Sequence, residues 1–297
     1  IITINKKKAN MKRESTLSYI FILLFSNGVY AYDANNKCEN LLNAGANEKA
    51  IEESKKLEHK YDANFCAAKA YYRNGNLKAS IAAFDESLKY PDLPIDQLFA
   101  YLYKGIAERD IGELKTSSAT FTKGLDTAAL GNSKYMQMER KFLYQLGNNA
   151  IKDKNGFDAV DFYSKSLVIS SNDDERAEGF AGLSVAYFQS NKIDQAIENG
   201  VKASTTYQRT GKLSEYADMQ LTLASYESLN ANYPRSIRLL QSIENFAKTN
   251  GSQYYEAKAL IAMSDVYGLS KQPQLASEAL DKGEAIAKAI GAADLLR

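Results

Sequence analysis

The chain has 297 residues, of which 45% are hydrophobic and 25% are charged, a composition typical of folded globular proteins. Its 37 Lys and Arg residues nearly balance its 36 Asp and Glu residues, so no net field would attract nucleic-acid phosphates or an anionic membrane. We therefore expect no nucleic acid among its partners. Only 4 prolines occur, and the abundance of Ala, Leu, Lys and Glu predicts an all-α protein.

The first 31 residues have the features of an export signal. After Met11 come two basic residues, an apolar run from 17 to 25 and, at 29–31, the sequence Val-Tyr-Ala, which matches a small-residue cleavage site. The run is shorter than the ~20 residues that span a bilayer, so we prefer cleavage to a membrane anchor. We expect 1–31 to be a signal peptide with an upstream extension and 32–297 to be a helical-repeat domain that is exported, to the periplasm or outside the cell.

Export would place the chain in an oxidising compartment, where cysteines form disulfides. The mature part contains two cysteines, Cys38 and Cys66, which are 28 positions apart. A bridge over that distance would add roughly 3 to 4 kcal/mol to the stability of the fold. We favour a Cys38–Cys66 disulfide, and the alternative is a pair of buried free thiols.

Small residues recur in pairs along the chain, and the two members of each pair are 12 positions apart. In a tight antiparallel helix pair, a small residue on the first helix lets the second helix approach, and the second helix offers another small residue at the crossing. The constant separation therefore predicts a series of helical hairpins with one crossing in each. The pairs are Cys38 and Ala50, Ala68 and Ser80, Gly105 and Ser117, Gly147 and Ala159, Ser184 and Ala196, Ala224 and Ser236, and Ser264 and Ala276.

Two further positions follow the crossing residue of each second helix. Seven residues on, we expect a small residue where the next hairpin packs; it is found at Ser87, Gly124, Ser166, Ala203 and Gly283, with Leu57 and Ile243 as exceptions. Four residues on, we expect a large side chain that wedges between hairpins; it is found at Phe84, Phe121, Tyr163 and Leu280, with Gly200 as an exception.

The segment Phe180-x-x-Leu183-Ser184-x-x-Tyr187, followed by Ala196, resembles the tetratricopeptide (TPR) repeat. The resemblance implies a right-handed α-solenoid of about seven antiparallel helix hairpins. Successive crossing residues of the second helices, from Ser80 to Ala276, are 37, 42, 37, 40 and 40 positions apart, which is more than the usual ~34. The sequence is therefore similar to a long-repeat variant, with longer helices or longer links between hairpins.

Glycines mark the ends of the predicted helices. Gly75 and Gly112 fall inside hairpins, where a residue that tolerates positive φ ends the first helix. Gly211, Gly251 and Gly291 are spaced by 40 and fall between hairpins. By this spacing, Gly291 should precede another first helix or a short terminal cap.

Catalytic and metal chemistry are poorly supported by the sequence. The single histidine, His59, lies in a charged run that is typical of a solvated helix face, and the cysteines do not form a C-x-x-C metal motif. No phosphate-loop motif is present. The acidic run 173–175 lacks the turn glycine of a calcium loop and suits the start of a helix. We expect a protein that is not an enzyme and needs no metal and no cofactor.

The resemblance also implies where a partner would bind. In TPR proteins the first helices line a groove, and their inward-pointing residues hold a peptide or a helix. Such a mixed strip suits a segment with apolar anchors and some acidic character, although each aromatic residue has burial between helices as its alternative. Carried over by position, the partner contacts are Phe65, Lys69, Tyr72, Arg73, Leu102, Ile106, Arg109, Tyr144, Asn148, Ile151, Lys152, Val185 and Phe188. Phe65 and Ile106 depart from the family's clamp for a C-terminal carboxylate.

Two functional hypotheses follow from the sequence. The first is an exported, non-catalytic TPR-like scaffold that binds a protein or peptide partner in the cell envelope. The second is the extracytoplasmic sensor portion of a larger membrane signalling receptor, with a membrane helix beyond Arg297. A third class, an envelope enzyme, would need a catalytic group that we do not find.

Overall fold

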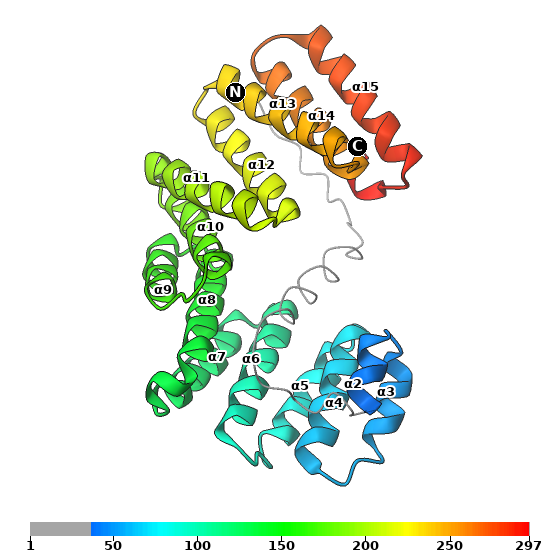
Figure 1. Cartoon of the computed structure of the whole chain (residues 1–297), viewed down its shortest axis with the longest axis vertical. Coiled ribbons are helices and arrows are strands. Elements are labelled where there is room, and N and C mark those ends of the chain that lie inside the picture. Colours follow the sequence, from blue (N-terminus) through cyan, green and yellow to red (C-terminus); the bar gives the residue numbers. More distant parts are fainter. Residues whose placement is uncertain (1–36, 297) are drawn as a thin grey trace, which may run out of the picture. The chain divides into compact units, whose positions relative to one another are not determined.

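The computed structural model describes residues 37–296, and this part of the chain is an all-α, right-handed α-solenoid of seven antiparallel helix hairpins (Figure 1). No strand occurs within these residues. The expected signal peptide, 1–31, lies outside the described residues. The helices are α2 (Lys37–Asn43), α3 (Asn47–Ser54), α4 (Lys60–Arg73), α5 (Leu77–Ser87), α6 (Pro94–Asp110), α7 (Leu114–Ala129), α8 (Met136–Lys152), α9 (Gly156–Val168), α10 (Asp173–Gln189), α11 (Ile193–Thr210), α12 (Leu213–Leu229), α13 (Tyr233–Thr249), α14 (Gln253–Leu269) and α15 (Pro273–Ala289), with short 3-10 helices η2 (Asn132–Tyr135) and η3 (Ala293–Leu295).

The small residues predicted at the helix crossings lie at the contact between the two helices of each hairpin. All but Ala276, in the last hairpin, are buried. In four hairpins a serine hydroxyl donates a hydrogen bond to the backbone carbonyl of its partner 12 residues away, which closes the crossing with a polar contact as well as a steric one. These bonds run from Ser80 to Ala68 at 2.8 Å, and from Ser117 to Gly105, Ser184 to Ala196 and Ser236 to Ala224 at 2.7 Å each.

The predicted wedge residues pack against the crossing glycines. A Cβ atom added to Gly147 would lie 2.7 Å from the ring of Tyr163, and one added to Gly182 of the next hairpin would lie 2.6 Å from the same ring. The Tyr163 ring is therefore held between two hairpins. Phe121 occupies the same place over Gly105, so these glycines are required by the close approach of an aromatic ring.

The second small position makes two kinds of contact. Gly124 faces Phe142 of the following hairpin, as expected. The Ser166 hydroxyl instead donates to the carbonyl of Arg140, 3.2 Å away, in the first helix of its own hairpin, and Gly283 likewise faces Ile261 of its own hairpin. This position therefore contacts the next hairpin at Gly124 and its own hairpin at Ser166 and Gly283, because a second helix packs on first helices on both of its sides.

Every hairpin turns through three residues, and the middle residue has positive φ. Gly45, Gly75 and Gly112 supply this conformation in the first three hairpins. The next four use non-glycine residues, namely Lys154, Asn191, Ala231 and Lys271, with φ between 57° and 60°. Each turn is closed by a hydrogen bond from the third residue to the carbonyl five positions earlier, for example from Asn232 to Glu227 at 2.8 Å. The sequence revealed only the two turns that we assigned from glycine.

Both explanations for the long repeat apply. Helices α12 to α15 have 17 residues each, and residues 211–212 alone separate α11 from α12. Helices α5 and α9 have only 11 and 13 residues, and longer links follow them at 88–93 and 169–172. Asparagine caps fix some helix starts: the Asn172 side chain accepts a hydrogen bond from the Glu175 amide at 2.9 Å.

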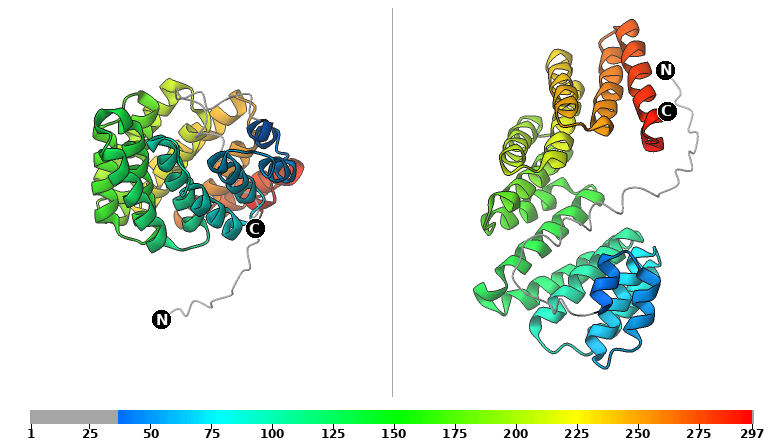
Figure 2. Two further views of the ribbon diagram at one scale, coloured as in Figure 1. Left: turned by 90° about the horizontal axis from the view of Figure 1, so that it is seen from below. Right: turned by 45° about the vertical axis from the view of Figure 1, so that its right-hand side comes forward.

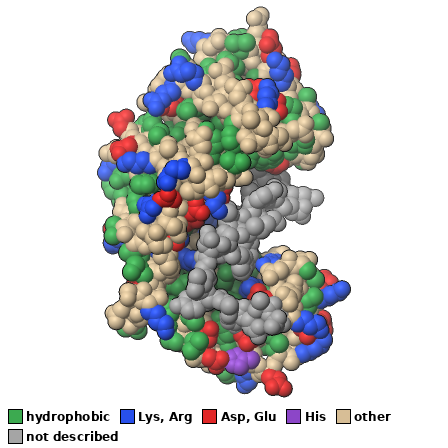
Figure 3. All heavy atoms as spheres, viewed as in Figure 1, with side chains coloured by type: hydrophobic (Ala, Val, Ile, Leu, Met, Phe, Trp, Pro, Cys, Tyr) green, Lys and Arg blue, Asp and Glu red, His purple; other side chains and the backbone are tan. Residues whose placement is uncertain are grey.

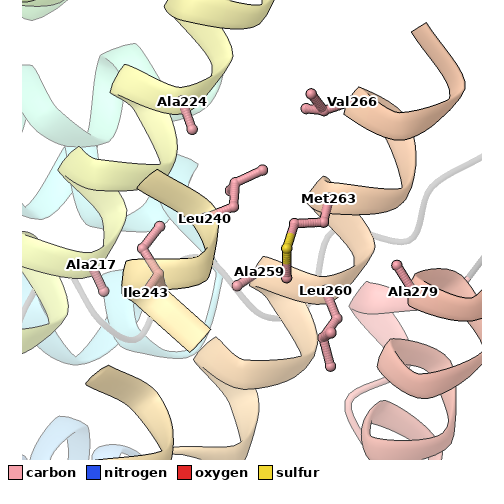
Figure 4. Packing of buried hydrophobic residues seen from close by; sticks show 9 residues of the cluster. All are labelled: Ala217, Ala224, Leu240, Ile243, Ala259, Leu260, Met263, Val266 and Ala279. Carbon is pink, nitrogen blue, oxygen red and sulfur yellow. The ribbon is translucent and has the colours of Figure 1, made fainter. Parts of the chain in front are cut away.

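The hairpins stack in sequence order, and each helix packs mainly on the helices before and after it in the sequence (Figures 1 and 2). In the last two hairpins, Leu240 and Ile243 of α13 pack toward Ala259 and Met263 of α14 (Figure 4). The turn at Gly291 is followed by η3, a single 3-10 turn.

Residue 231 offers a test of the turn geometry. A non-glycine residue in the left-handed region destabilises the folded state by about 1 to 2 kcal/mol. Glycine removes this cost, but it also increases the conformational entropy of the unfolded chain, which offsets part of the stabilisation. We expect Ala231→Gly to raise the free energy of unfolding by about 1 kcal/mol, measured by urea denaturation. Ala82→Gly, at an exposed site inside α5, is the matched control and should lower it by about 1 kcal/mol. Equal effects of the two changes would contradict the turn assignment.

Candidate partner-binding face

The residues predicted to contact a partner lie on the first helices α4, α6, α8 and α10, and the structure divides them into two groups. Three of them face the core: Phe65, Leu102 and Ile106 are 6%, 2% and 3% exposed. Phe65 packs edge-on against Phe84 and Tyr103, with ring centroids 5.6 and 5.7 Å away. These three side chains offer almost no surface to a partner, because they are buried between helices; the ring partners of Phe65 lie on the second helix α5 and the first helix α6.

The predicted polar residues on α4 and α6 tie one first helix to the next. Lys69 of α4 forms an ion pair with Glu39 of α2 at 2.7 Å and is 3% exposed. The Tyr72 hydroxyl donates to the Asp110 carboxylate on α6. The Arg109 guanidinium donates to the Gln145 side-chain oxygen on α8.

Arg73 of α4 extends this series, because its guanidinium donates to the backbone carbonyl of Leu42 at the end of α2. The four polar residues that were predicted as partner contacts on α4 and α6 therefore act as structural links between neighbouring hairpins. A substitution at any of these positions would disturb helix packing, so they are poor probes of partner binding.

Burial changes the proton affinity of these links. Desolvation lowers the pKa of Lys69 despite its pairing with Glu39, and it lowers the pKa of Arg109 as well. Burial and the hydrogen bond to Asp110 raise the pKa of Tyr72. Each shift has the sign expected when a charged form loses water. The Tyr72 hydroxyl therefore remains a hydrogen-bond donor at any physiological pH.

The six remaining predicted residues keep part of their surface and cluster on two helices. We call them the α8–α10 face: Tyr144, Asn148, Ile151 and Lys152 on α8, and Val185 and Phe188 on α10. The Gln189 side chain donates to the Ile151 carbonyl at 3.0 Å, which joins the C-terminal ends of α8 and α10.

Several contacts hold the α8–α10 face rigid. The Tyr163 hydroxyl donates to the Asn148 side-chain oxygen at 2.6 Å, and the Tyr144 and Tyr163 ring centroids are 5.3 Å apart. Phe188 stacks on Tyr226 of α12, with centroids 4.2 Å apart, and burial raises the pKa of Tyr226 to about 12. A preformed surface of this kind loses little conformational entropy when it binds a partner.

The sequence interpretation missed charged neighbours of this face. Lys141 and Glu178 occupy the position six residues before the crossing residues Gly147 and Ser184. Glu178 accepts from the buried Arg140 at 3.0 Å, and burial with the Arg140 charge nearby lowers the pKa of Lys141. The 12-residue spacing of the crossings locates both positions, whereas the predicted strip begins only three residues before the crossing, at Tyr144.

The two cysteines lie close together, as expected, and form a disulfide between α2 and α4. Their Cα atoms are 6.4 Å apart, a separation that a disulfide spans. Cys38 and Cys66 are 0% and 2% exposed and belong to a buried cluster with Leu42, Ala50 and Ala70. The bridge therefore joins the first helices of the first two hairpins through their core.

His59 and the acidic run 173–175 have structural roles. His59, at the N-terminal end of α4, pairs with Asp92 at 2.7 Å. The acidic run 173–175 forms the first turn of α10, where the helix dipole favours negative charge. On the face drawn in Figure 3, Lys and Arg alternate with Asp and Glu. Within residues 37–296, no group of His, Cys, Asp or Glu is arranged to hold a metal ion.

No helix in this described part is both long and apolar enough to cross a bilayer. This finding concerns residues 37–296 alone. It gives no information about the apolar run at 17–25, which lies outside the described residues.

The fold and the arrangement of the crossings define a TPR-like helical-repeat protein. Solved structures with this architecture include the apo form of RapI, with 16% identity, 85% of this chain and 82% of that chain covered, and a TM-score of 0.63. A Rap protein complexed with Competence and Sporulation Factor has 10% identity, coverage of 84% and 76%, and a TM-score of 0.59. At these identities the likeness concerns the fold alone.

A third similar structure is a signal transduction ATPase with numerous domains from Pyrococcus horikoshii, which has a tetratricopeptide repeat sensor. It shares 14% identity and a TM-score of 0.70 over 87% of this chain, which spans only 42% of that protein. No protein-family model and no curated protein matches this sequence.

The disulfide gives a prediction about stability. We expect the double variant Cys38→Ser with Cys66→Ser to lose roughly 3 kcal/mol of unfolding free energy, because the unfolded chain is no longer restricted by the 28-residue loop. Urea denaturation with and without reductant measures the loss. Reductant should destabilise the wild type and leave the variant unchanged, and an equal response of both proteins would contradict the bridge.

Proposed function

We propose that this chain is an exported, non-catalytic scaffold of the cell envelope, and that it binds a protein or peptide partner through the α8–α10 face. The observation that carries this proposal is the contrast between the two groups of predicted residues. On α4 and α6 the side chains are buried or tied to neighbouring hairpins. On α8 and α10, aromatic and aliphatic side chains remain partly exposed to solvent, and hydrogen bonds and ring stacking hold them in place.

The chemistry of the α8–α10 face favours a partner segment with apolar anchors. Ile151, Val185 and Phe188 are half-buried, and rigid apolar side chains of this kind dominate the binding energy of many interfaces. Lys152 is exposed at the C-terminal end of α8 and suits a carboxylate on the partner segment. An amphipathic helix or an extended peptide meets both requirements.

Export is supported by the sequence of the first 31 residues and by the disulfide. The basic start, apolar run and small-residue site at 29–31 are those of a secretory signal. The Cys38–Cys66 bridge is of a kind that persists in oxidising compartments. A periplasmic or extracellular scaffold accounts for both features.

The second candidate function is the sensor portion of a larger membrane signalling receptor. One structure with this fold, the ATPase from Pyrococcus horikoshii, has a repeat sensor within a longer chain, of which our chain spans 42%. The reading frame around the coding sequence separates the two candidates. An apolar run of ~20 residues beyond Arg297 would favour the receptor, and a stop codon directly after Arg297 would favour the scaffold.

Partner binding is tested by placing a charge on the α8–α10 face. We expect Val185→Asp to abolish affinity capture of the partner from an envelope fraction, because burying an unpaired carboxylate in an apolar interface is strongly unfavourable. Val201→Asp is the matched control, since Val201 lies on the second helix α11 with 44% exposure. It should capture the same protein as the wild type.

Thermal unfolding of both variants checks that the fold survives. The binding proposal fails if Val185→Asp captures the same protein as well as the wild type does, or if Val201→Asp loses it to the same degree.

Export is tested with residues 1–36 fused to a phosphatase that is active only outside the cytoplasm. We expect phosphatase activity from this fusion and its loss with Leu23→Arg, which interrupts the apolar run that the secretion machinery recognises. Immunoblotting confirms equal amounts of the two fusions. An inactive wild-type fusion, at equal amounts of protein, would refute the proposed location.

A further inference from the structure

A second surface lies on the other side of α8, between the second helices α7 and α9. It is a groove of about 370 Å³, and its floor is formed by the C-terminal half of α8. Leu114, Leu146 and Phe162 line it with apolar surface, and Asn149 lies at its base. The groove shares none of its lining residues with the α8–α10 face.

The orientation of the Asn149 amide is fixed by its neighbours. The Ser117 hydroxyl donates its hydrogen to the Gly105 carbonyl at 2.7 Å, so its oxygen can only accept a further bond. The Asn149 amide nitrogen supplies that bond at 2.8 Å and also donates to Ser118 at 3.0 Å. The side-chain oxygen of Asn149 must therefore point away from both serines.

This oxygen has no hydrogen-bond donor within the described residues, although Asn149 is only 2% exposed. A buried acceptor without a donor is destabilising, and native structures seldom retain one without a reason. The same position in the neighbouring hairpins holds Ala107 and Ala186, which are fully buried. The fold therefore does not need a polar residue here.

Ser118, on α7, is a second polar side chain that lines the groove. It stands one residue after the crossing residue of its helix, where the hairpins on either side carry Ile81 and Val160, and among the others the last hairpin carries Ser277. Two polar side chains thus replace apolar ones at a single junction, and both line the same groove. The structure contains a local acceptor site in an otherwise apolar interface.

The charges at the rim are mainly acidic. Asp153 and Asp158 line the groove together with one lysine, Lys115. Asp158 accepts a hydrogen bond from the Asn155 side chain at 2.6 Å, and Asp153 lies at the C-terminal end of α8. A ligand for this groove therefore needs a hydrogen-bond donor for its base, an apolar group for its wall and a positive charge for its rim.

We propose that this groove binds a short extended peptide segment that carries an apolar residue and, two positions further on, a basic one. A backbone N–H of the segment donates to the Asn149 side-chain oxygen, the apolar side chain packs on Leu146 and Phe162, and the basic side chain pairs with Asp153. An extended backbone offers the required donor in every residue but proline, and side chains two positions apart point to the same side of the segment and supply the other two groups.

The proposal is tested by isothermal titration calorimetry with acetyl-Leu-Ala-Arg-Ala-amide and its Arg-to-Glu counterpart. We expect the arginine peptide to bind at least tenfold more tightly than the glutamate peptide. Asn149→Ala should weaken the arginine peptide at least tenfold, because the backbone donor loses its acceptor. This variant copies the alanine of the adjacent hairpins, and its melting temperature should not fall.

Two controls separate this site from the rest of the chain. Ser277→Ala changes the exposed position of the last hairpin that corresponds to Ser118 and should leave peptide binding unchanged. Val185→Asp, which tests the α8–α10 face, should also leave it unchanged, so the two proposals can fail independently.

The proposal is overturned if neither peptide binds, or if Asn149→Ala binds the arginine peptide as tightly as the wild type does. It is also overturned if a crystal structure grown with the peptide shows only a water molecule on the Asn149 oxygen.

Discussion

The close approach of two helices at a pair of small residues 12 positions apart is the constraint on which this structure depends. Where one of the two is serine, its hydroxyl also bonds the opposite backbone, as Ser80 and Ser236 do. This contact fixes where the helices cross, and the crossing fixes which large side chain, such as Tyr163, can reach the next hairpin. The path of the chain follows from repeating this unit seven times.

A repeat that uses so few positions for its architecture leaves the others for different purposes. On α4 and α6, the side chains of Tyr72 and Arg109 join successive first helices. On α8 and α10, the corresponding positions retain surface, and on the far side of α8 the apolar pattern is interrupted by Asn149. The fold is therefore uniform along the chain, whereas its surface chemistry is concentrated in the third to fifth hairpins.

The sequence predicted the fold more completely than the site. Spacing alone located the crossings and the wedge residue Tyr163, because sterics forbid large side chains at these points. It failed at the turns, where Ala231 adopts positive φ without any glycine to reveal it. It failed for Phe65 and Ile106 because position within a repeat gives the direction of a side chain, whereas burial depends on how closely the next hairpin packs. The acceptor at Asn149 required the coordinates, since an asparagine in a helix reveals nothing about its bonding partners.

The short distance between crossing partners also bears on how the chain folds. Each hairpin closes a loop of 12 positions, and the helices pack mainly on their neighbours in the sequence. The entropy lost on closing such a short loop is small, and proteins rich in local contacts fold quickly. Any hairpin of the array can thus act as a nucleus from which structure spreads to the adjacent hairpins. The disulfide joins the first two hairpins covalently and so favours that end of the array as a starting point.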